Sequence, residues 1–100
     1  MNAPHAAAQT GGDALLASLS VVVVTYNSAH CIPALANALR ELPYVFIVDN
    51  ASSDNTLAEV ARLLPQARTV RHARNLGFGA ANNAALRQVA TPFALPLNPD

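Results

Sequence analysis

The chain has little charge, and this scarcity excludes several classes of function. Only 12% of its 100 residues are charged, and the six basic residues, all arginines, are balanced by six acidic ones. A nucleic-acid-binding surface needs a basic stripe, and a polybasic membrane patch needs clustered cations. The sequence has neither, so nucleic acid is not an expected partner.

Cysteine is also scarce, because Cys31 is the single one in the sequence. One cysteine excludes an internal disulfide framework and a multi-cysteine metal site. It fits a reducing compartment, and the residue is expected to be a small buried hydrophobe. The spacing of His5, His30 and His72 is not that of metal ligands, so all three are expected on the surface or in loops.

Long apolar runs are missing as well. No stretch approaches the roughly 18 apolar residues of a membrane span. Residues 1–18 contain neither Lys nor Arg and no apolar run of signal-peptide length, so a secretory signal is not expected. These residues are predicted to form a flexible leader. Residues 19–100 are predicted to form one small domain, for which a hydrophobic content of 52% supplies a core.

The chain does contain an alternation of β-branched runs and amphipathic stretches. Strands are predicted at residues 19–25, 44–48, 67–71 and 93–97. The continuous apolar run at 19–25 is typical of a strand covered on both faces, which favours a parallel sheet. Strands that alternate with helices predict a Rossmann-like α/β fold, with right-handed crossovers and helices on both faces of the sheet.

Three helices are predicted between the strands from apolar residues at helical spacing. Pro33 suits the first turn of the first helix, and Ser53 or Asp54 is expected to cap the second. Pro96 is awkward inside the last strand and predicts a bulge or a strand end just before Asn98. The predicted apolar faces are Ile32, Leu35, Leu39 and Leu42; Leu57, Val60, Ala61 and Leu64; and Phe78, Ala81, Ala85 and Val89.

A polar cluster follows each predicted strand. The carboxyl ends of parallel strands meet at one edge of a sheet, and open α/β sheets bind their ligands there. We therefore expect the four clusters to lie together and to form one binding site. They are Thr25-Tyr26-Asn27, Asp49-Asn50-Ala51-Ser52, Arg74-Asn75-Leu76-Gly77-Phe78-Gly79 and Asn98-Pro99-Asp100.

The first two clusters suggest a nucleoside site. Asp49, at the end of the second strand, is well placed to accept hydrogen bonds from a nucleoside. Tyr26 can pack on a base while Thr25 or Asn27 hydrogen-bonds to it. Ordinary turn and cap chemistry explains the same residue types, and it is the simpler interpretation of Asp54.

The last two clusters suggest a phosphate and metal site. The loop with Gly77 and Gly79 leads into a helix N-terminus, whose backbone N–H groups suit a phosphate. A dinucleotide fingerprint is a poor fit, because Asn82 replaces its third glycine and the loop follows the third strand. Arg74 can neutralise phosphate or lie in solvent. Asp100 can hold Mg²⁺ or Mn²⁺ against a pyrophosphate, because hard oxygen ligands suit these ions.

Together these segments resemble the start of family-2 glycosyltransferases, and most closely the rhamnosyltransferase-like subgroup. The likeness covers residues 19–100. It implies a GT-A fold, a nucleoside-diphosphate-sugar donor, a divalent Mg²⁺ or Mn²⁺ ion and inversion at the anomeric carbon. The motifs, in the order of the family, are Val21–Ser28, Val48–Asp54, Asn75–Phe78 with Asn82-Asn83, and Leu97–Asp100.

The resemblance also implies roles for single residues in the first two clusters. Thr25, Tyr26 and Asn27 would line the base pocket. Asp49 would contact the base or the ribose, and Asn50 would belong to the same donor-binding group.

The remaining implied roles concern phosphate, sugar and metal. Asp54 would hold the nucleotide loop or only cap its helix. Asn98 stands where the family has the first aspartate of its Asp-x-Asp metal motif, which leaves the metal contact to Asp100. The residues implied to shape the floor under the sugar and the phosphates are Asn75, Gly77 and Phe78.

By the same likeness, the acceptor half of the family lies beyond position 100, with the carboxylate that acts as general base. The chain is therefore expected to be the donor-binding half of a longer enzyme, inactive on its own. A dTDP- or UDP-sugar, with rhamnose as the first choice, would be transferred to a glycan or lipid-linked acceptor in cell-surface polysaccharide synthesis. The expected location is the cytoplasm, with peripheral association at the inner face of the cell membrane as an option for the full-length enzyme.

Two alternatives stay open. One is a non-catalytic module that binds a nucleotide sugar. The other is a nucleotidyltransferase, which would usually carry a glycine-rich loop with Arg and Lys directly after the first strand. Here that loop is Tyr26–His30 and the chain has no lysine, so this alternative is the weaker one.

Overall fold

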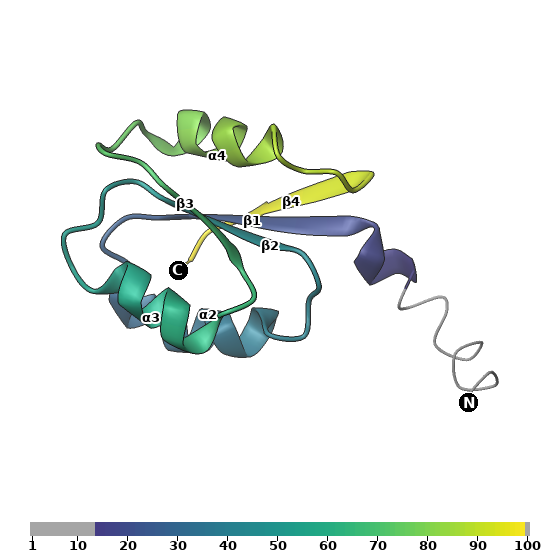
Figure 1. The fold of residues 1–100 in the computed structure, drawn as a ribbon, viewed down its shortest axis with the longest axis horizontal. Coiled ribbons are helices and arrows are strands. Elements are labelled where there is room, and N and C mark those ends of the chain that lie inside the picture. Colours follow the sequence, from purple (N-terminus) through teal and green to yellow (C-terminus); the bar gives the residue numbers. More distant parts are fainter. Residues whose placement is uncertain (1–13, 100) are drawn as a thin grey trace.

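The predicted strands form one parallel sheet in the order β3-β2-β1-β4 (Figure 1). The computed structural model describes residues 14–99. The leader prediction for residues 1–13 and the metal prediction for Asp100 lie outside the described residues. Residues 14–17, which also belong to the predicted leader, are helical.

The strands lie within one residue of their predicted bounds. They are β1 (Leu19–Thr25), β2 (Val45–Asp49), β3 (Arg68–Arg71) and β4 (Phe93–Leu97). The register is continuous on both sides of β1, where Val21 lies beside Val45 of β2 and beside Leu95 of β4. The fold class expected from the alternating strands and helices is therefore confirmed.

Three helices cover the two faces of the sheet (Figure 1). Helices α2 (Ile32–Leu39) and α3 (Thr56–Leu63) lie on one face, and α4 (Phe78–Leu86) lies on the other. A short 3₁₀ helix, η1 (Ala29–Cys31), precedes α2, which has proline in its first turn as predicted. Among the described residues, none of the helices combines the length and apolar character that crossing a membrane requires.

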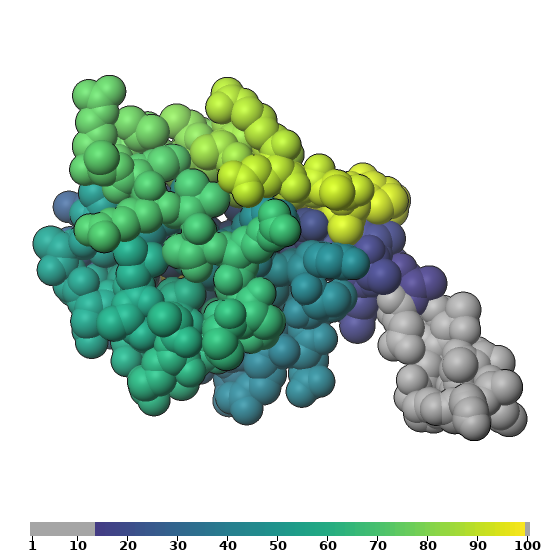
Figure 2. All heavy atoms as spheres, viewed as in Figure 1, coloured from purple at the N-terminus to yellow at the C-terminus, as the bar shows by residue number. Residues whose placement is uncertain are grey.

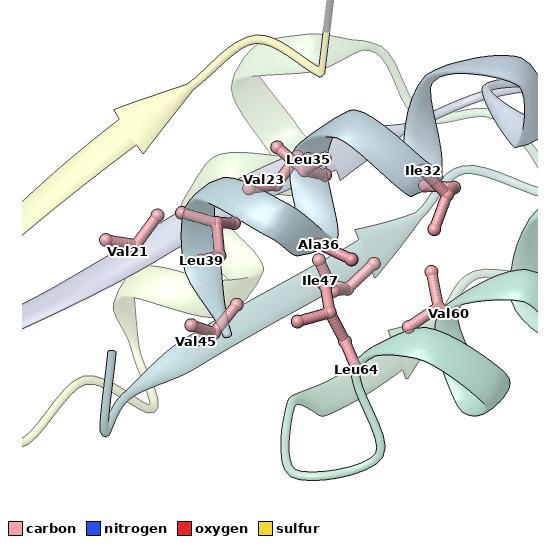
Figure 3. Close-up of a cluster of buried hydrophobic side chains, with 10 residues drawn as sticks. All are labelled: Val21, Val23, Ile32, Leu35, Ala36, Leu39, Val45, Ile47, Val60 and Leu64. Carbon is pink, nitrogen blue, oxygen red and sulfur yellow. The ribbon is translucent and has the colours of Figure 1, made fainter. Parts of the chain in front are cut away.

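Alternate residues of β1 and β2 point to opposite faces and build two hydrophobic clusters. On the α2 and α3 face, Val21, Val23, Val45 and Ile47 pack against residues from both helices (Figure 3). On the other face, the intervening residues pack against α4. This second cluster consists of Val22, Val24, Phe46, Val48, Ala81 and Ala85. Burying β1 and β2 on both faces fixes where their carboxyl ends lie.

Three details of the predicted burial were wrong. Ala61 is exposed and Leu63 packs partly against the core, because α3 meets the sheet through a slightly rotated face. Phe78 stands at the first turn of α4 and remains exposed, whereas Ala81 and Ala85 are buried. Cys31 is partly exposed at the end of η1.

Pro96 causes no bulge in β4. It pairs in register with Val22, and the strand ends at Leu97, directly before Asn98 as predicted. Among the described residues β4 is an edge strand, with β1 as its neighbour. Proline is tolerated on an edge strand because its missing N–H can face the open side. In Figure 2 the yellow residues at the end of the chain lie on the visible surface.

Candidate functional site

The four polar clusters meet around a cavity at the carboxyl edge of the sheet, as expected. We call it the edge cavity. Its volume is about 490 Å³, within the range of ligand pockets in proteins. Residues from the ends of β1, β2 and β4 and from the loop between β3 and α4 line it. They are Val24, Tyr26, Asn27, Ser28, His30, Asn50, Asn75, Gly77, Phe78, Asn98 and Pro99.

The strand order explains why the cavity lies at this place. The chain runs outward from β1 through β2 to β3 and then crosses back to β4 on the other side of β1. The segment after β1 leads to α2 on one face of the sheet, whereas the loop after β3 leads to α4 on the other face, so the two segments diverge at this edge (Figure 1). Ligands of open α/β sheets bind at such a switch point, outside the carboxyl ends of the strands.

Asp49 organises the loop that follows β2. Its carboxylate is fully buried and accepts three hydrogen bonds. The hydroxyls of Thr25 and Ser52 donate to Oδ1 at 2.7 and 2.6 Å, and the Ser52 N–H donates to Oδ2 at 2.8 Å. These donors occupy the carboxylate within the protein, so Asp49 and Thr25 do not line the edge cavity.

Asn27 joins the loop after β1 to the loop after β2. It adopts a positive φ of 48°, a conformation that asparagine tolerates better than most residues. Its Oδ1 accepts hydrogen bonds from the N–H groups of Ser53 and Asp54 at 2.8 and 3.3 Å. Its own N–H donates to Ser52 Oγ at 2.8 Å. The two loops are thus locked together beside the cavity.

Asp54 is not the N-cap of α3 as predicted, because that position is Asn55, but its carboxylate contacts the start of the helix and bridges it to η1. Its Oδ1 accepts the N–H of Thr56 at the start of α3 and also the Thr56 hydroxyl. Its Oδ2 accepts the N–H of Ala29 in η1 at 3.2 Å. The hydrogen bond from the Thr56 hydroxyl, helped by those backbone N–H groups, lowers the pKa of Asp54 below its ordinary value of 3.8.

Asn50 holds the opposite wall. It is buried at the end of β2, and its amide reaches across to the loop between β3 and α4. Nδ2 donates to the carbonyl oxygen of Gly77 at 3.1 Å, while Oδ1 lies 3.0 Å from Nδ1 of His72 and 3.4 Å from the N–H of Leu76. This one side chain therefore fixes the loop that forms this wall of the edge cavity.

Two exposed aromatic rings and a helix N-terminus surround the cavity. Tyr26 is 53% exposed and Phe78 is 55% exposed, although both line the cavity. Gly77 precedes α4 with a φ of 86°, a conformation that other residues rarely adopt. The first N–H groups of α4 have no partner within the helix and favour an anion nearby. The described lining residues include no Lys, Arg, Asp or Glu.

The structure brings most of the predicted site residues together. Those that line the edge cavity are Tyr26, Asn27, Asn50, Asn75, Gly77, Phe78 and Asn98. Thr25, Asp49 and Asp54 lie behind its walls and form hydrogen bonds within the protein. Direct contact of these three with a ligand stays a prediction. Arg74 is exposed and does not line the cavity.

Two polar lining residues were missed by the sequence reasoning. His30 was expected to be an ordinary surface or loop residue, and it is exposed, yet it lines the cavity from η1. Ser28 also lines the cavity and is buried, with its N–H donating to Thr56 Oγ1 at 2.9 Å. The signal available was position alone, because both residues follow β1 within the loop that was assigned to the site.

A metal site was predicted at Asp100, outside the described residues. Within residues 14–99 no group of three His, Cys, Asp or Glu side chains is arranged to hold a metal ion. The described residue nearest to the predicted site in the chain is Pro99, and Asn98 offers an amide oxygen that suits Mg²⁺ or Mn²⁺. The described residues offer one such oxygen, and the metal site stays a prediction that depends on the carboxylate of Asp100.

A comparison with protein-family models identifies a family. The model described as "Glycosyl transferase family 2" matches residues 20–100. A search of curated proteins found no match. The matched range contains β1 except for Leu19, all of β2 to β4, and both walls of the edge cavity.

Proposed function

The chain belongs to glycosyl transferase family 2, and we propose that its edge cavity binds the nucleoside-diphosphate part of a sugar donor. The proposed activity is transfer of the sugar, with inversion, to a glycan or lipid-linked acceptor in cell-surface polysaccharide synthesis. A dTDP- or UDP-sugar is the proposed donor, with rhamnose as the first choice from the motif likeness. Cytoplasmic action, with peripheral membrane association of a longer enzyme, belongs to the same proposal.

The observation that carries this proposal is the convergence of four separate chain segments on one cavity of about 490 Å³. Each segment is polar, and each follows a strand of the sheet at its carboxyl end. The cavity offers an aromatic ring from Tyr26 and amides from Asn27 and Asn98. A base needs stacking and hydrogen bonds, and these side chains supply both.

Diphosphate charge would have to be met mainly by groups other than basic side chains. The described lining residues include no Lys or Arg, whereas the N-terminus of α4 presents backbone N–H groups beside Gly77 and Phe78. A Mg²⁺ or Mn²⁺ ion held by Asp100, with Asn98 beside it, would act as a Lewis acid on the departing diphosphate. Nucleotide binding is therefore expected to depend on the divalent ion.

The proposed reaction is a single displacement. An acceptor hydroxyl oxygen forms the new bond to the anomeric carbon while the bond from that carbon to the diphosphate oxygen breaks. The hydroxyl proton passes to a general base, and the nucleoside diphosphate leaves with the bonding electron pair. The described lining residues would contribute to donor recognition. They include no carboxylate that could serve as the general base.

That last observation also favours the second candidate, a module that binds a nucleotide sugar without transferring it. The two candidates predict the same nucleotide affinity and differ in turnover. Incubating the 100-residue chain with a labelled donor and a glycan acceptor tests the second candidate, because sugar transfer would exclude a module that only binds. Sugar transfer by this chain would contradict the expectation that the general base lies beyond residue 100.

Binding itself is tested by calorimetric titration of the chain with UDP and with dTDP, with and without Mn²⁺. We expect Tyr26→Ala to weaken the binding about tenfold, since stacking a base on an aromatic ring contributes on the order of 1–3 kcal/mol. Tyr44→Ala is a matched control, because Tyr44 is similarly exposed but does not line the edge cavity. The proposal fails if the folded chain binds neither nucleotide, or if both variants lose the same affinity.

A further inference from the structure

The loop between β3 and α4 depends on few contacts to keep its shape. Residues 73–80 are all exposed, although Gly77 and Phe78 line the edge cavity. Among the described residues, the side-chain hydrogen bonds that tie this loop to the sheet all involve Asn50. The shape of this part of the cavity wall therefore depends on how the Asn50 amide is oriented.

Two partners fix that orientation independently. The carbonyl oxygen of Gly77 can only accept, so the atom that faces it at 3.1 Å must be the amide nitrogen of Asn50. The N–H of Leu76 can only donate, so the atom that it approaches at 3.4 Å must be the amide oxygen. Both constraints give the same orientation of the amide, which is how such assignments are made from a hydrogen-bond network.

The orientation of the amide determines where the proton of His72 lies. Nδ1 of His72 is 3.0 Å from the same Asn50 oxygen, which has no hydrogen to donate. A hydrogen bond between these atoms requires that Nδ1 carry a proton. A neutral His72 is therefore the Nδ1–H tautomer. The position of the residue is fixed by its backbone N–H, which donates to the Asp49 carbonyl oxygen at 2.9 Å.

We infer that His72 is a positioning residue of the edge cavity, which holds the Asn50 amide in the orientation that fixes the Gly77 loop. His72 is not among the residues that line the cavity, so it acts through Asn50. This inference rests on the proposed function for its effect on nucleotide binding. The tautomer itself is independent of that function and gives a separate test.

The tautomer is measured by nitrogen-15 NMR of the histidine ring at pH 9, where imidazole side chains are neutral. The couplings between the ring nitrogens and the carbon-bound ring protons show which of the two nitrogens carries the proton. We expect His72 to be the Nδ1–H form. An Nε2–H form would overturn the inference, whatever the chain binds.

The role in binding is tested with two substitutions. In His72→Asn the amide nitrogen is separated from the backbone by the same number of bonds as Nδ1, so it can donate to Asn50 in the same way. His72→Leu has a similar branched shape but no donor. If the loss of this partly buried hydrogen bond releases the Gly77 loop, a change of about tenfold in nucleotide affinity follows.

We therefore expect His72→Leu to bind UDP or dTDP about tenfold more weakly with Mn²⁺, and His72→Asn to bind within about twofold of the parent chain. Thr69→Ala, an exposed change on β3, the strand that ends directly before His72, is the control and should leave the affinity unchanged. Equal weakening by Leu and Asn would overturn the inference. Absence of binding by the parent chain would instead contradict the proposed function, while the tautomer measurement would still test the role of His72.

Discussion

The two walls of the edge cavity are built in different ways. The first wall, which we call the closed wall, is formed by the loops after β1 and β2. It is held by hydrogen bonds within the protein, centred on the Asp49 carboxylate and the Asn27 amide. The second wall, which we call the open wall, is formed by the β3–α4 loop and β4 and is exposed along much of its length. A single buried side chain, Asn50, fixes its loop, and β4 pairs with β1 as its neighbour among the described strands.

The difference indicates which wall is preorganised. Groups that are satisfied within the protein have one arrangement whether or not a ligand is present, so the first wall can recognise a ligand without reorganising. The loop of the open wall leads into α4, where the buried Oδ1 of Asn82 has no hydrogen-bond partner among residues 14–99. We expect removal of a polar side chain to lower the free energy of unfolding in the closed wall and to raise it beside the open wall.

The largest effect is expected at Asp49 in the closed wall. Asp49→Ala would leave the buried Thr25 hydroxyl and the partly buried hydroxyl and N–H of Ser52 without their acceptor. Hydrogen bonds to a charged group and the desolvation of the donors left behind give a loss of about 3 kcal/mol in the free energy of unfolding. Urea denaturation of the two chains measures this loss.

Asp49→Asn is the matched control for that substitution. It keeps the shape and one acceptor oxygen but loses the charge, so about half of the loss is expected. A loss below about 1 kcal/mol for Asp49→Ala would mean that the carboxylate is not the organising centre of the closed wall. The comparison of the two walls would then fail at its strongest point.

A gain in the free energy of unfolding is expected for a substitution at Asn82 in α4, the helix that follows the loop of the open wall. Only 8% of this residue is exposed, and Asn82→Leu replaces a buried amide oxygen by an apolar group of similar shape. Removing an unsatisfied polar group should raise the free energy of unfolding by about 1.5 kcal/mol. Asn83→Leu, an exposed change on the same helix, should have almost no effect. A clear loss of stability in Asn82→Leu would show that the amide has a partner in solution.

Much of the fold could be predicted from the sequence, because apolar runs and their spacing report burial directly. The strand order could not be predicted in this way, and it explains Pro96, which is tolerated because β4 lies at the edge of the described sheet. The face of α3 was misjudged at Ala61, since a small side chain gives a weak signal in a helix of eight residues.

The candidate site was predicted as a group, but the direction of single side chains was not. The same residue types suit a carboxylate that faces a ligand and one that faces its own loop. Asp49 was expected to face a nucleoside, and its donors include Thr25, which lies 24 residues away in the chain. Such partners become visible only when the strands are aligned. His72 followed no motif at all, because its role depends on its distance from Asn50.

A smaller effect is expected at Ala51, again in the closed wall. Its φ of 66° places the Cβ in a left-handed conformation that costs L-residues about 1 kcal/mol or more. Ala51→Gly removes this cost but loosens the unfolded chain, so a net gain of about 0.5 kcal/mol is expected. Ala58→Gly in α3, where Ala58 is exposed and helical, should instead destabilise the chain by about 1 kcal/mol. Thermal unfolding of both variants would show whether the closed wall keeps strain at Ala51.

The smallest effect concerns pH and the exposed Asp54. The Thr56 hydroxyl and nearby N–H groups lower its folded pKa, so the carboxylate stabilises the folded chain fully above its unfolded pKa of about 3.8. This contribution is lost as the pH falls through the lower folded pKa. The difference in urea midpoint between the parent chain and Asp54→Asn should therefore be larger at pH 6 than at pH 2.5. Because Asp54 is exposed, added salt should reduce this difference. A difference that stayed constant with pH would mean that Asp54 only fills space between η1 and α3, and that neutral hydrogen bonds alone join the two loops of the closed wall.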